Sequence, residues 1–309
     1  MTVRAVVVGS LVMDLSFRVP HRPEPRTVVI ADDFGTFRGG KGYNQAIALA
    51  RLGARVTMIG AVGADAHGDA FIDALEREGV DASRVVQLRG TATAVAGALI
   101  TPDGEVAFVQ LPGANRQLAP AHCADLPDCD IALLQGEVDP GTSLRVARVI
   151  RRRGAEVLLN TAPQDEMTDE LVAAASIICA NEAQARALYP RLRGGGRGDE
   201  SPADIASALA RDERLAIITL GPRGAVVAGR GDGAVEVTPP PVDTLDATAV
   251  SDAFCAALAV ALVEGRDRVQ AARFACAAAA HTATVRGSEP ALPSRDQVEA
   301  LLATAPCPG

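Results

Sequence analysis

The fold is decided by residues 131–188, which have the sequence IALLQGEVDPGTSLRVARVIRRRGAEVLLNTAPQDEMTDELVAAASIICANEAQARAL. Buried strands are predicted for its three short apolar runs, Ile131–Gln135, Val157–Asn160 and Ile177–Cys179. Helices are predicted for the segments that follow these runs, Gly141–Arg152, Glu170–Ala174 and Glu182–Leu188. Strands that alternate with helices predict an α/β fold, in which a mostly parallel central sheet has helices on both faces.

The same alternation extends outward from this stretch in both directions. Towards the C-terminus, the pattern predicts a helix at Ile205–Ala210, a strand at Leu215–Thr219, a hairpin at Ala225–Val237, and helices at Thr248–Glu264, Val269–Val285 and Gln297–Ala303. Towards the N-terminus, it predicts strands at Val3–Val8, Thr27–Ala31 and Val56–Ile59, and helices at Gly42–Leu52 and Asp69–Glu78.

One early region departs from the alternation. The runs Thr93–Ile100 and Val106–Leu111 flank Asp103-Gly104, which is a strong hairpin signal. We expect a small β-sheet, or lid, built from about residues 11–38 and 92–112. We expect this lid to be attached to a single α/β domain that spans residues 1–309.

Composition and charge narrow the classes of partner. The 309 residues are 48% hydrophobic, which is enough for a sizeable core, and the net charge is −8. An acidic chain without a dominant basic stretch argues against nucleic acid or an anionic membrane as its partner. No apolar run is a convincing membrane helix, and the six cysteines form no CxxC pair that indicates zinc. These features predict a protein of the reducing cytoplasm.

A glycine-rich segment, Gly39-Gly40-Lys41-Gly42-Tyr43-Asn44-Gln45, precedes the first predicted helix. It matches neither the P-loop pattern nor the dinucleotide-binding pattern. Its glycines allow a close approach of the backbone to a ligand, and Lys41 and Asn44 supply donors for hydroxyl groups. Lys41 is also the only lysine of the chain. The alternative to a binding loop is a simple glycine-rich turn.

A second segment, residues 243–254, leads into an apolar helix and places Asp252 in or near the first turn. One interpretation is an acidic residue that complements the helix dipole. The other makes Asp252 a general base that takes a proton from a substrate hydroxyl, while the N–H groups of Ala249, Val250, Ser251 and Asp252 hold the developing anion.

These segments, together with several others in the expected order, resemble the ribokinase-like (PfkB-type) family of carbohydrate kinases from about residue 3 to residue 300. The other matching segments are Val7–Asp14, Gly113–Asn115, Gln135–Glu137, Asn181-Glu182, Thr219–Gly224 and the Ala-rich Phe274–Gly287. The resemblance implies a ribokinase-like fold, ATP and Mg²⁺ as cosubstrate and cofactor, a K⁺ ion, and a homodimer formed through the lid.

The resemblance also implies a role for each matching residue. It assigns the binding of sugar hydroxyls to Asp14, Gly39, Gly40, Lys41, Asn44 and Glu137. It assigns the nucleotide site to Asn181, Thr219, Gly221, Gly224 and Cys276. It makes Asp252 the general base and places a monovalent cation at Asp246 and backbone groups near Val285–Gly287.

Two departures from the family pattern leave alternatives open. The second signature has Ala249-Val250-Ser251 where the family has Gly-Ala-Gly, and Gln184 replaces a Glu that helps to position hydrated Mg²⁺. Besides an ATP-dependent kinase that phosphorylates a primary hydroxyl of a sugar, nucleoside or sugar-like compound, these changes allow two other interpretations. One is an enzyme of the same fold with altered phosphate chemistry, such as a phosphatase or a transferase using another phosphate carrier. The other is a catalytically impaired metabolite-binding protein.

Residues near the predicted sugar site also differ from the family. Val12 stands where relatives have Asn, and Met13 and Tyr43 replace small residues. These substitutions predict a more apolar pocket, which suits a nucleoside or modified cyclitol better than a simple pentose.

Overall fold

The computed structural model describes residues 2–103, 105–193, 199–211, 214–229 and 232–304. Across these residues, a large central sheet has the order β13 (Asp232–Val237), β12 (Ala225–Gly229), β11 (Leu215–Thr219), β10 (Ile177–Asn181), β9 (Glu156–Asn160), β8 (Ile131–Leu134), β1 (Arg4–Val8), β4 (Arg55–Gly63) and β5 (Asp81–Leu88). Strands β12 and β13 run antiparallel to their neighbours, and the other strands pair in parallel. This arrangement confirms the mostly parallel sheet that the sequence predicts.

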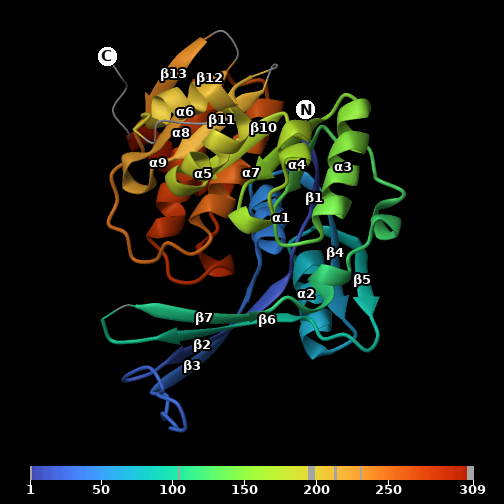
Figure 1. Cartoon of the computed structure of the whole chain (residues 1–309), viewed down its shortest axis with the longest axis vertical. Coiled ribbons are helices and arrows are strands. Elements are labelled where there is room, and N and C mark those ends of the chain that lie inside the picture. Colours follow the sequence, from blue (N-terminus) through green and yellow to red (C-terminus); the bar gives the residue numbers. More distant parts are fainter. Residues whose placement is uncertain (1, 104, 194–198, 212–213, 230–231, 305–309) are drawn as a thin grey trace.

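Helices cover both faces of this sheet, because alternate strand residues bury their apolar side chains on opposite sides. Side chains such as Val7 join one core cluster with α1 (Lys41–Arg51), α2 (Ala66–Arg77), α7 (Val250–Val263), α8 (Arg268–Ala283) and α9 (Arg295–Thr304). Side chains such as Val6 and Val8 join the other cluster with α3 (Pro140–Arg152), α4 (Asp169–Ala174), α5 (Glu182–Arg193) and α6 (Pro202–Leu209). The resulting three layers are visible in Figure 1.

The strand order reverses between β1 and β8. From β1 the chain builds outward through β4 to β5, whereas β8 to β11 extend in the opposite direction. Ligands of open α/β sheets bind beyond the carboxyl ends of the strands at such a reversal point. The topology therefore predicts a ligand site beside the residues that follow β1 and β8.

A separate sheet has the order β3 (Asp33–Gly39), β2 (Val12–Arg18), β6 (Ala94–Ile100) and β7 (Val106–Leu111). It extends away from the layered body at one end of the molecule (Figure 1). The β6–β7 hairpin predicted around Asp103 is present, although Gly104 lies outside the described residues. We call this four-stranded sheet the lid.

Two predictions about local structure were wrong. Thr27–Ala31 forms no strand, and the strand lies instead at β3, whose residues pair with β2. Val28 and Ile30 are β-branched but highly exposed, so their strand propensity finds no partner to pack against. The sequence pattern also missed β5, which lies at the edge of the central sheet and has polar residues facing solvent.

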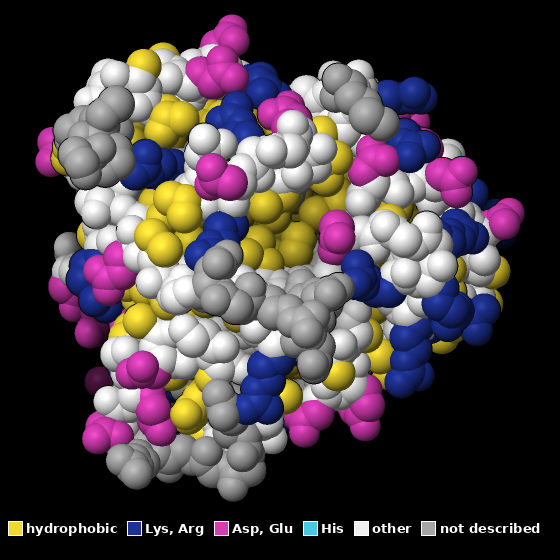
Figure 2. All heavy atoms as spheres, turned by 90° about the horizontal axis from the view of Figure 1, so that it is seen from above, with side chains coloured by type: hydrophobic (Ala, Val, Ile, Leu, Met, Phe, Trp, Pro, Cys, Tyr) yellow, Lys and Arg dark blue, Asp and Glu magenta, His cyan; other side chains and the backbone are white. Residues whose placement is uncertain are grey.

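The molecular surface at the end opposite the lid is shown in Figure 2. Basic and acidic side chains are interspersed over the described part of this face, around a hollow with apolar side chains. None of the helices in the described part of the chain combines the length and hydropathy that a membrane crossing requires.

Candidate active site

The predicted sugar-binding and catalytic residues converge at the reversal point of the central sheet. Ser10 follows β1, Glu137 follows β8, and Lys41 begins α1. Asp14 lies on the lid strand β2, and Asp252 lies in the first turn of α7. Hydrogen bonds and an ion pair between these groups show that residues far apart in the sequence lie in one site.

Asp252 is only 3% exposed and is held by two amide side chains of α1. Its Oδ2 accepts a hydrogen bond from Asn44 Nδ2 at 3.0 Å, and its Oδ1 accepts one from Gln45 Nε2 at 3.0 Å. Burial raises the pKa of Asp252 above its ordinary value, while Lys41 and the two amide donors oppose that rise. A carboxylate with a raised pKa and fixed orientation suits a general base.

Lys41 and Glu137 form the polar centre of the site. Lys41 Nζ lies 3.9 Å from Glu137 Oε1, and the Lys41 backbone N–H donates to Glu137 Oε2 at 3.1 Å. The hydroxyl of Ser10 also donates to Glu137 Oε2. Burial lowers the pKa of Lys41, but Asp252, Glu137 and Asp14 outweigh this effect and raise it above its ordinary value. Lys41 therefore carries a positive charge at neutral pH, beside the carboxyl groups of Asp252, Glu137 and Asp14.

Asp14 reaches this centre from the lid. Burial, reinforced by Glu137 and opposed by Lys41, raises the pKa of Asp14 to about 6. A side chain on Gly39 would collide with the Asp14 carboxylate, so the glycine leaves room for this acid. The lid thus contributes a partly buried carboxylate that can accept hydrogen bonds from hydroxyl groups.

Glycine is required at positions 40 and 42, around the start of α1, by the backbone conformation and by close packing. Gly40 has φ 91°, and a Cβ atom there would lie 2.8 Å from the Val12 nitrogen. A Cβ atom on Gly42 would lie 2.6 Å from the backbone of Gly9 and Ser10. Only glycine permits this conformation and this close packing against the turn after β1.

The start of α7 shows which of the residues that replace the family's Gly-Ala-Gly needs a special backbone conformation. Ser251 is helical and exposed, so a side chain is tolerated there. The left-handed residue is instead Ala249, with φ 59° and ψ 3°. The first N–H groups of a helix lack intrahelical partners, although the Asp252 N–H already donates to the Ala249 carbonyl at 3.0 Å. Val250 and Ser251 therefore offer the N–H groups best suited to an anion.

The residues predicted to bind nucleotide form a second group at the ends of β10 and β11. Asn181 and Thr219 are paired in register on these neighbouring strands. Gln184 Oε1 accepts from the Asn181 N–H at 2.9 Å and from the Thr161 hydroxyl at 3.3 Å. The Gln184 N–H in turn donates to Asn181 Oδ1 at 2.8 Å. Gln184 thus uses its side-chain oxygen to stabilise the start of α5.

Two glycines follow β11, and each has a positive φ. Gly221 has φ 60° and open space where a side chain would lie, whereas Gly224 has φ 94° and packs against Val237 and Pro239. Cys276, on α8, is buried beside the Val237 carbonyl, and burial raises the pKa of its thiol to about 12. Cys276 is therefore a buried thiol whose raised pKa disfavours the thiolate.

Asp246, the predicted cation ligand, is hydrogen-bonded to the segment after α8. Its Oδ2 accepts from the Gly287 N–H at 2.9 Å, and its Oδ1 accepts from the Thr248 N–H at 2.9 Å. Burial would raise the pKa of Asp246, but the hydrogen bonds from Thr248 and Gly287 lower it below its ordinary value. An ionised carboxylate beside this turn fits a monovalent cation. Among the described residues, no group of three or more His, Cys, Asp or Glu side chains is arranged to hold a metal ion.

Sequence reasoning missed three polar residues of the site. Ser10 donates to Glu137, Gln45 donates to Asp252, and Gln135 Nε2 donates to Gln45 Oε1 at 2.6 Å. Gln45 and Gln135 are completely buried. For Gln45, a signal was available in the sequence. A glutamine on the apolar face of a predicted helix is buried, and a buried amide requires a polar partner.

The expectation that Met13 and Tyr43 line an apolar pocket was wrong. Both side chains are buried in the core, and Tyr43 packs edge-on against Phe71 at 5.0 Å between ring centroids. The Tyr43 hydroxyl donates to Glu289 Oε2 at 2.8 Å. Val12 is on the same lid face as Asp14 and forms a small cluster with Ala94 and Ala96.

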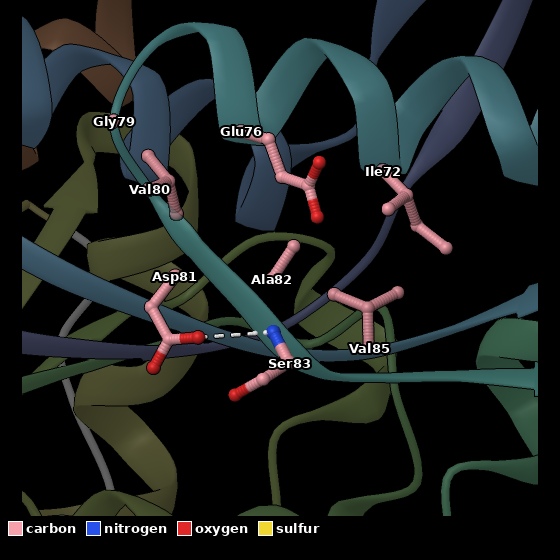
Figure 3. Close-up of a pocket in the computed structure, with 8 residues that line it drawn as sticks. All are labelled: Ile72, Glu76, Gly79, Val80, Asp81, Ala82, Ser83 and Val85. Atoms are coloured by element: carbon pink, nitrogen blue, oxygen red, sulfur yellow. Dashed lines mark hydrogen bonds between the residues drawn. The ribbon is translucent and has the colours of Figure 1, made fainter.

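A surface pocket of about 580 Å³ lies elsewhere, between α2 and β5 (Figure 3). Glu76 and Asp81 are its charged lining residues, and Asp81 already accepts a hydrogen bond from the Ser83 N–H at 3.0 Å. This pocket is shallow and contains none of the residues described above.

Comparison with known proteins identifies the family to which the chain belongs. A model of the pfkB family of carbohydrate kinases matches residues 3–295. Ribokinase from Bacillus subtilis is 34% identical over 300 residues, covering 96% of this chain and 98% of that protein. Ribokinase from Haemophilus influenzae is 31% identical over 297 residues, covering 94% of this chain and 95% of that protein.

Solved structures show the same likeness over the whole chain. A structure of Arabidopsis thaliana ribokinase complexed with ribose and ATP superposes with a TM-score of 0.87 at 29% identity, covering 99% of this chain and 100% of that one. A structure of Thermotoga maritima ribokinase also has a TM-score of 0.87, at 28% identity, covering 98% of this chain and 100% of that one. By its sequence and by its fold, the chain belongs to the PfkB family of carbohydrate kinases.

Proposed function

We propose that this carbohydrate kinase transfers the γ-phosphate of ATP to a primary hydroxyl group of a sugar or of a compound that contains one, such as a nucleoside. The observation that carries the proposal is the buried Asp252 carboxylate, oriented by Asn44 and Gln45 beside Lys41 at the start of α7. The likeness to a ribokinase complexed with ribose and ATP supports both the acceptor class and the donor.

In the proposed reaction, the acceptor hydroxyl oxygen attacks the γ-phosphorus of ATP. A new P–O bond forms, the P–O bond to ADP breaks, and Asp252 takes the hydroxyl proton. The N–H groups of Val250 and Ser251 at the start of α7 hold the negative charge that develops on the transferred phosphoryl group. Asp252 afterwards releases its proton to solvent.

Acceptor binding is assigned to the groups around Lys41. Asp14 and Glu137 accept hydrogen bonds from acceptor hydroxyls, while Lys41 and Asn44 donate them. Gly39 and Gly40 contribute by leaving room for the Asp14 carboxylate and for the backbone of Val12 beside the acceptor. Because the lid supplies Asp14, binding and lid position are linked.

The donor side is assigned to the ends of β10 and β11. Asn181, Thr219, Gly221 and Gly224 border the nucleotide, and Cys276 contributes an apolar wall. Mg²⁺ bound to the nucleotide phosphates would supply charge neutralisation during transfer. Gln184 contributes indirectly, by holding the start of α5 in place. Asp246 and the turn at 285–287 suit K⁺, which would reinforce the geometry of the neighbouring α7 start.

We also propose that two chains associate through the lid in a reducing, cytoplasmic environment. Several large apolar side chains of the lid are exposed, including Phe34, Phe108, Val109 and Leu111. An apolar surface of this kind favours burial against a second copy. The described cysteines are free thiols, most of them buried, which suits a reducing compartment.

An assay with ATP, Mg²⁺ and K⁺ tests the proposed function, with D-ribose, 2-deoxy-D-ribose and inosine as acceptors. We expect one acceptor to yield ADP and a phosphate monoester in equal amounts, measured by ³¹P NMR. Release of inorganic phosphate from ribose 5-phosphate without ATP would instead favour a phosphatase. Binding of D-ribose in calorimetry with no ADP formation would favour a metabolite-binding protein.

A further inference from the structure

Glu289 lies outside the residues assigned above, in the turn Glu289–Ala291 that follows α8. Its carboxylate receives hydrogen bonds from two residues near the active-site loop. Arg38 donates through Nε to Oε2 at 2.8 Å and through Nη2 to Oε1 at 3.2 Å. Tyr43 donates through its hydroxyl to Oε2 at 2.8 Å. One carboxylate therefore holds both a lid residue and a helix residue.

Arg38 and Tyr43 flank Gly39–Gly42, the glycine-rich loop of the acceptor-binding segment, on either side. Arg38 is the residue before Gly39, at the end of β3, and Tyr43 is the residue before Asn44, in the first turn of α1. Between them, the loop is mostly glycine and has few side chains with which to anchor itself. Its position consequently depends on backbone packing and on what holds its two flanking residues.

A backbone contact reinforces the connection. The Ser288 hydroxyl donates to the Arg38 carbonyl at 2.8 Å, so both the side chain and the main chain of Arg38 are bound to the same turn. The next residue back, Gly287, donates its N–H to Asp246 at 2.9 Å. Segment 287–289 therefore bridges the acceptor loop and the irregular segment that leads into α7.

We propose that Glu289 is a positioning residue for the phosphoryl acceptor, acting through Arg38 and Tyr43 to fix the loop that carries Lys41 and the adjoining turn that carries Asn44. The inference rests on the proposed kinase function and adds a residue to it. Charge-assisted, bidentate hydrogen bonds are strong and geometrically specific, which is the property required to hold a glycine-rich loop. The donor site at β10 and β11 is separate from these contacts.

The test compares Glu289→Gln with the control Glu264→Gln. Glu264 accepts a bidentate pair from Arg295 at 2.6 and 2.8 Å, remote from the loop. The side chains of that pair are 24% and 32% exposed, against 16% and 31% for Glu289 and Arg38. The two variants therefore remove equivalent charges from ion pairs of similar burial, and both retain the size of the side chain.

With D-ribose as acceptor, we expect Glu289→Gln to raise the acceptor KM about tenfold, the effect of losing one charge-assisted hydrogen bond. The KM for ATP stays within about twofold, and kcat at saturating D-ribose falls less than the acceptor KM rises. Tyr43→Phe, which removes only the hydroxyl, shifts the acceptor KM in the same direction by a smaller factor. Glu264→Gln leaves the acceptor KM unchanged.

Hydrogen exchange tests the positioning role separately from catalysis. Amides of residues 39–44 should exchange faster in Glu289→Gln than in the wild type or in Glu264→Gln. Unchanged exchange at these amides, or an acceptor KM equal to that of Glu264→Gln, would overturn the inference. A wild-type chain that phosphorylates none of the tested acceptors would instead contradict the proposed function, while the exchange result would still decide the role of Glu289.

Discussion

At the scale of single residues, the site depends on how a buried carboxylate is held. Asp252 accepts a hydrogen bond from Gln45, and Gln45 accepts one from Gln135, so two buried amide side chains connect Asp252 with the core. Fixed donors keep the carboxylate oriented and favour its ionised form, against the burial that favours the protonated one. In the proposed mechanism, this balance sets the pH range in which Asp252 acts as the base.

Gln45→Leu should move the acidic limb of the kcat/KM–pH profile to higher pH. The substitution removes a donor that lowers the pKa of Asp252, so the raised pKa rises further and the base is protonated at higher pH. Gln135→Met is the control, because it leaves both donors to Asp252 in place. An acidic limb that stays at the wild-type pH in Gln45→Leu would argue that Asp252 is not the titrating base.

Asp14→Asn should raise the melting temperature at about pH 8, because folding then no longer buries a charge. The folded pKa of Asp14, about 6, lies above the ordinary value of 3.8, so ionised Asp14 opposes folding above both values. The gain should shrink as pH falls from 6 towards 3.8 and vanish below it. Calorimetry across this pH range measures the effect.

Asp130→Asn should change the melting temperature in the opposite direction to Asp14→Asn. Hydrogen bonds from Arg4 lower the pKa of Asp130, so its ionised form favours folding. Its replacement should therefore reduce the melting temperature at neutral pH, with a loss that disappears in acid. The same sign of change in both variants would contradict the assigned environments.

Polar residues that converge on the candidate site were easier to predict from the sequence than the directions in which individual side chains point. Lys41, Asn44 and Asp252 stand out because polar groups follow glycines or begin an apolar helix. Tyr43 was misplaced, because whether it faces the site or the core depends on the exact phase of α1. The partner of Tyr43, Glu289, is 246 residues away in the sequence, and no local pattern reveals such a contact.

At the scale of elements, the start of α7 is strained by its own sequence. Ala249 takes a left-handed conformation that costs a non-glycine residue about 1–2 kcal/mol. This residue precedes the N–H groups that we assign to the transferred phosphoryl group. Strain at such a position persists only where the surrounding structure enforces it.

Ala249→Gly should therefore stabilise the protein by about 0.5–1 kcal/mol, since relief of strain exceeds the entropy that glycine adds to the unfolded chain. Ala300→Gly, at an exposed position within α9, should destabilise it by about 0.5–1 kcal/mol. Urea unfolding of both variants gives the comparison. Destabilisation of equal size in the two would show that position 249 is not left-handed in solution.

Elements with regular burial were predicted well, and those at edges were not. The strands from β8 to β11 are buried on both faces, which produces continuous apolar runs in the sequence. Strand β5, at the sheet edge, mixes polar and apolar residues without a regular period and was missed. The exposed, β-branched residues Val28 and Ile30 produced the opposite error, a strand signal without a strand.

At the scale of the whole molecule, the lid presents apolar side chains that a single chain leaves exposed. Phe108 and Val109 are each 73% exposed. We expect the wild-type protein to elute as a dimer in size-exclusion chromatography with light scattering, at twice the chain mass of 31.8 kDa. Phe108→Glu should shift the protein towards monomer, because a charge at the interface would be buried without a partner.

Leu245→Glu is the control for this experiment, because Leu245 is 63% exposed but lies outside the lid. It should leave the mass unchanged. A wild-type protein that is monomeric at micromolar concentration would contradict association through the lid.

The parallel sheet was predictable from the alternation of strands and helices, but the order of its strands was not. The site exists because β1 lies between β4 and β8, which places Ser10, Lys41 and Glu137 together. Alternation along the chain does not specify which strands are neighbours in space. The family resemblance supplied this information, since its motifs imply a common site for residues far apart in the sequence.

The central claim is that Asp252 is the base of a phosphoryl transfer to a sugar hydroxyl, and Asp252→Asn tests it most directly. The variant keeps the size of the side chain and removes its ability to take a proton. With ATP, Mg²⁺ and D-ribose, we predict that kcat falls by about 10²–10⁴-fold, while D-ribose still binds in calorimetry. ADP formation by Asp252→Asn within about tenfold of the wild-type rate would contradict the account.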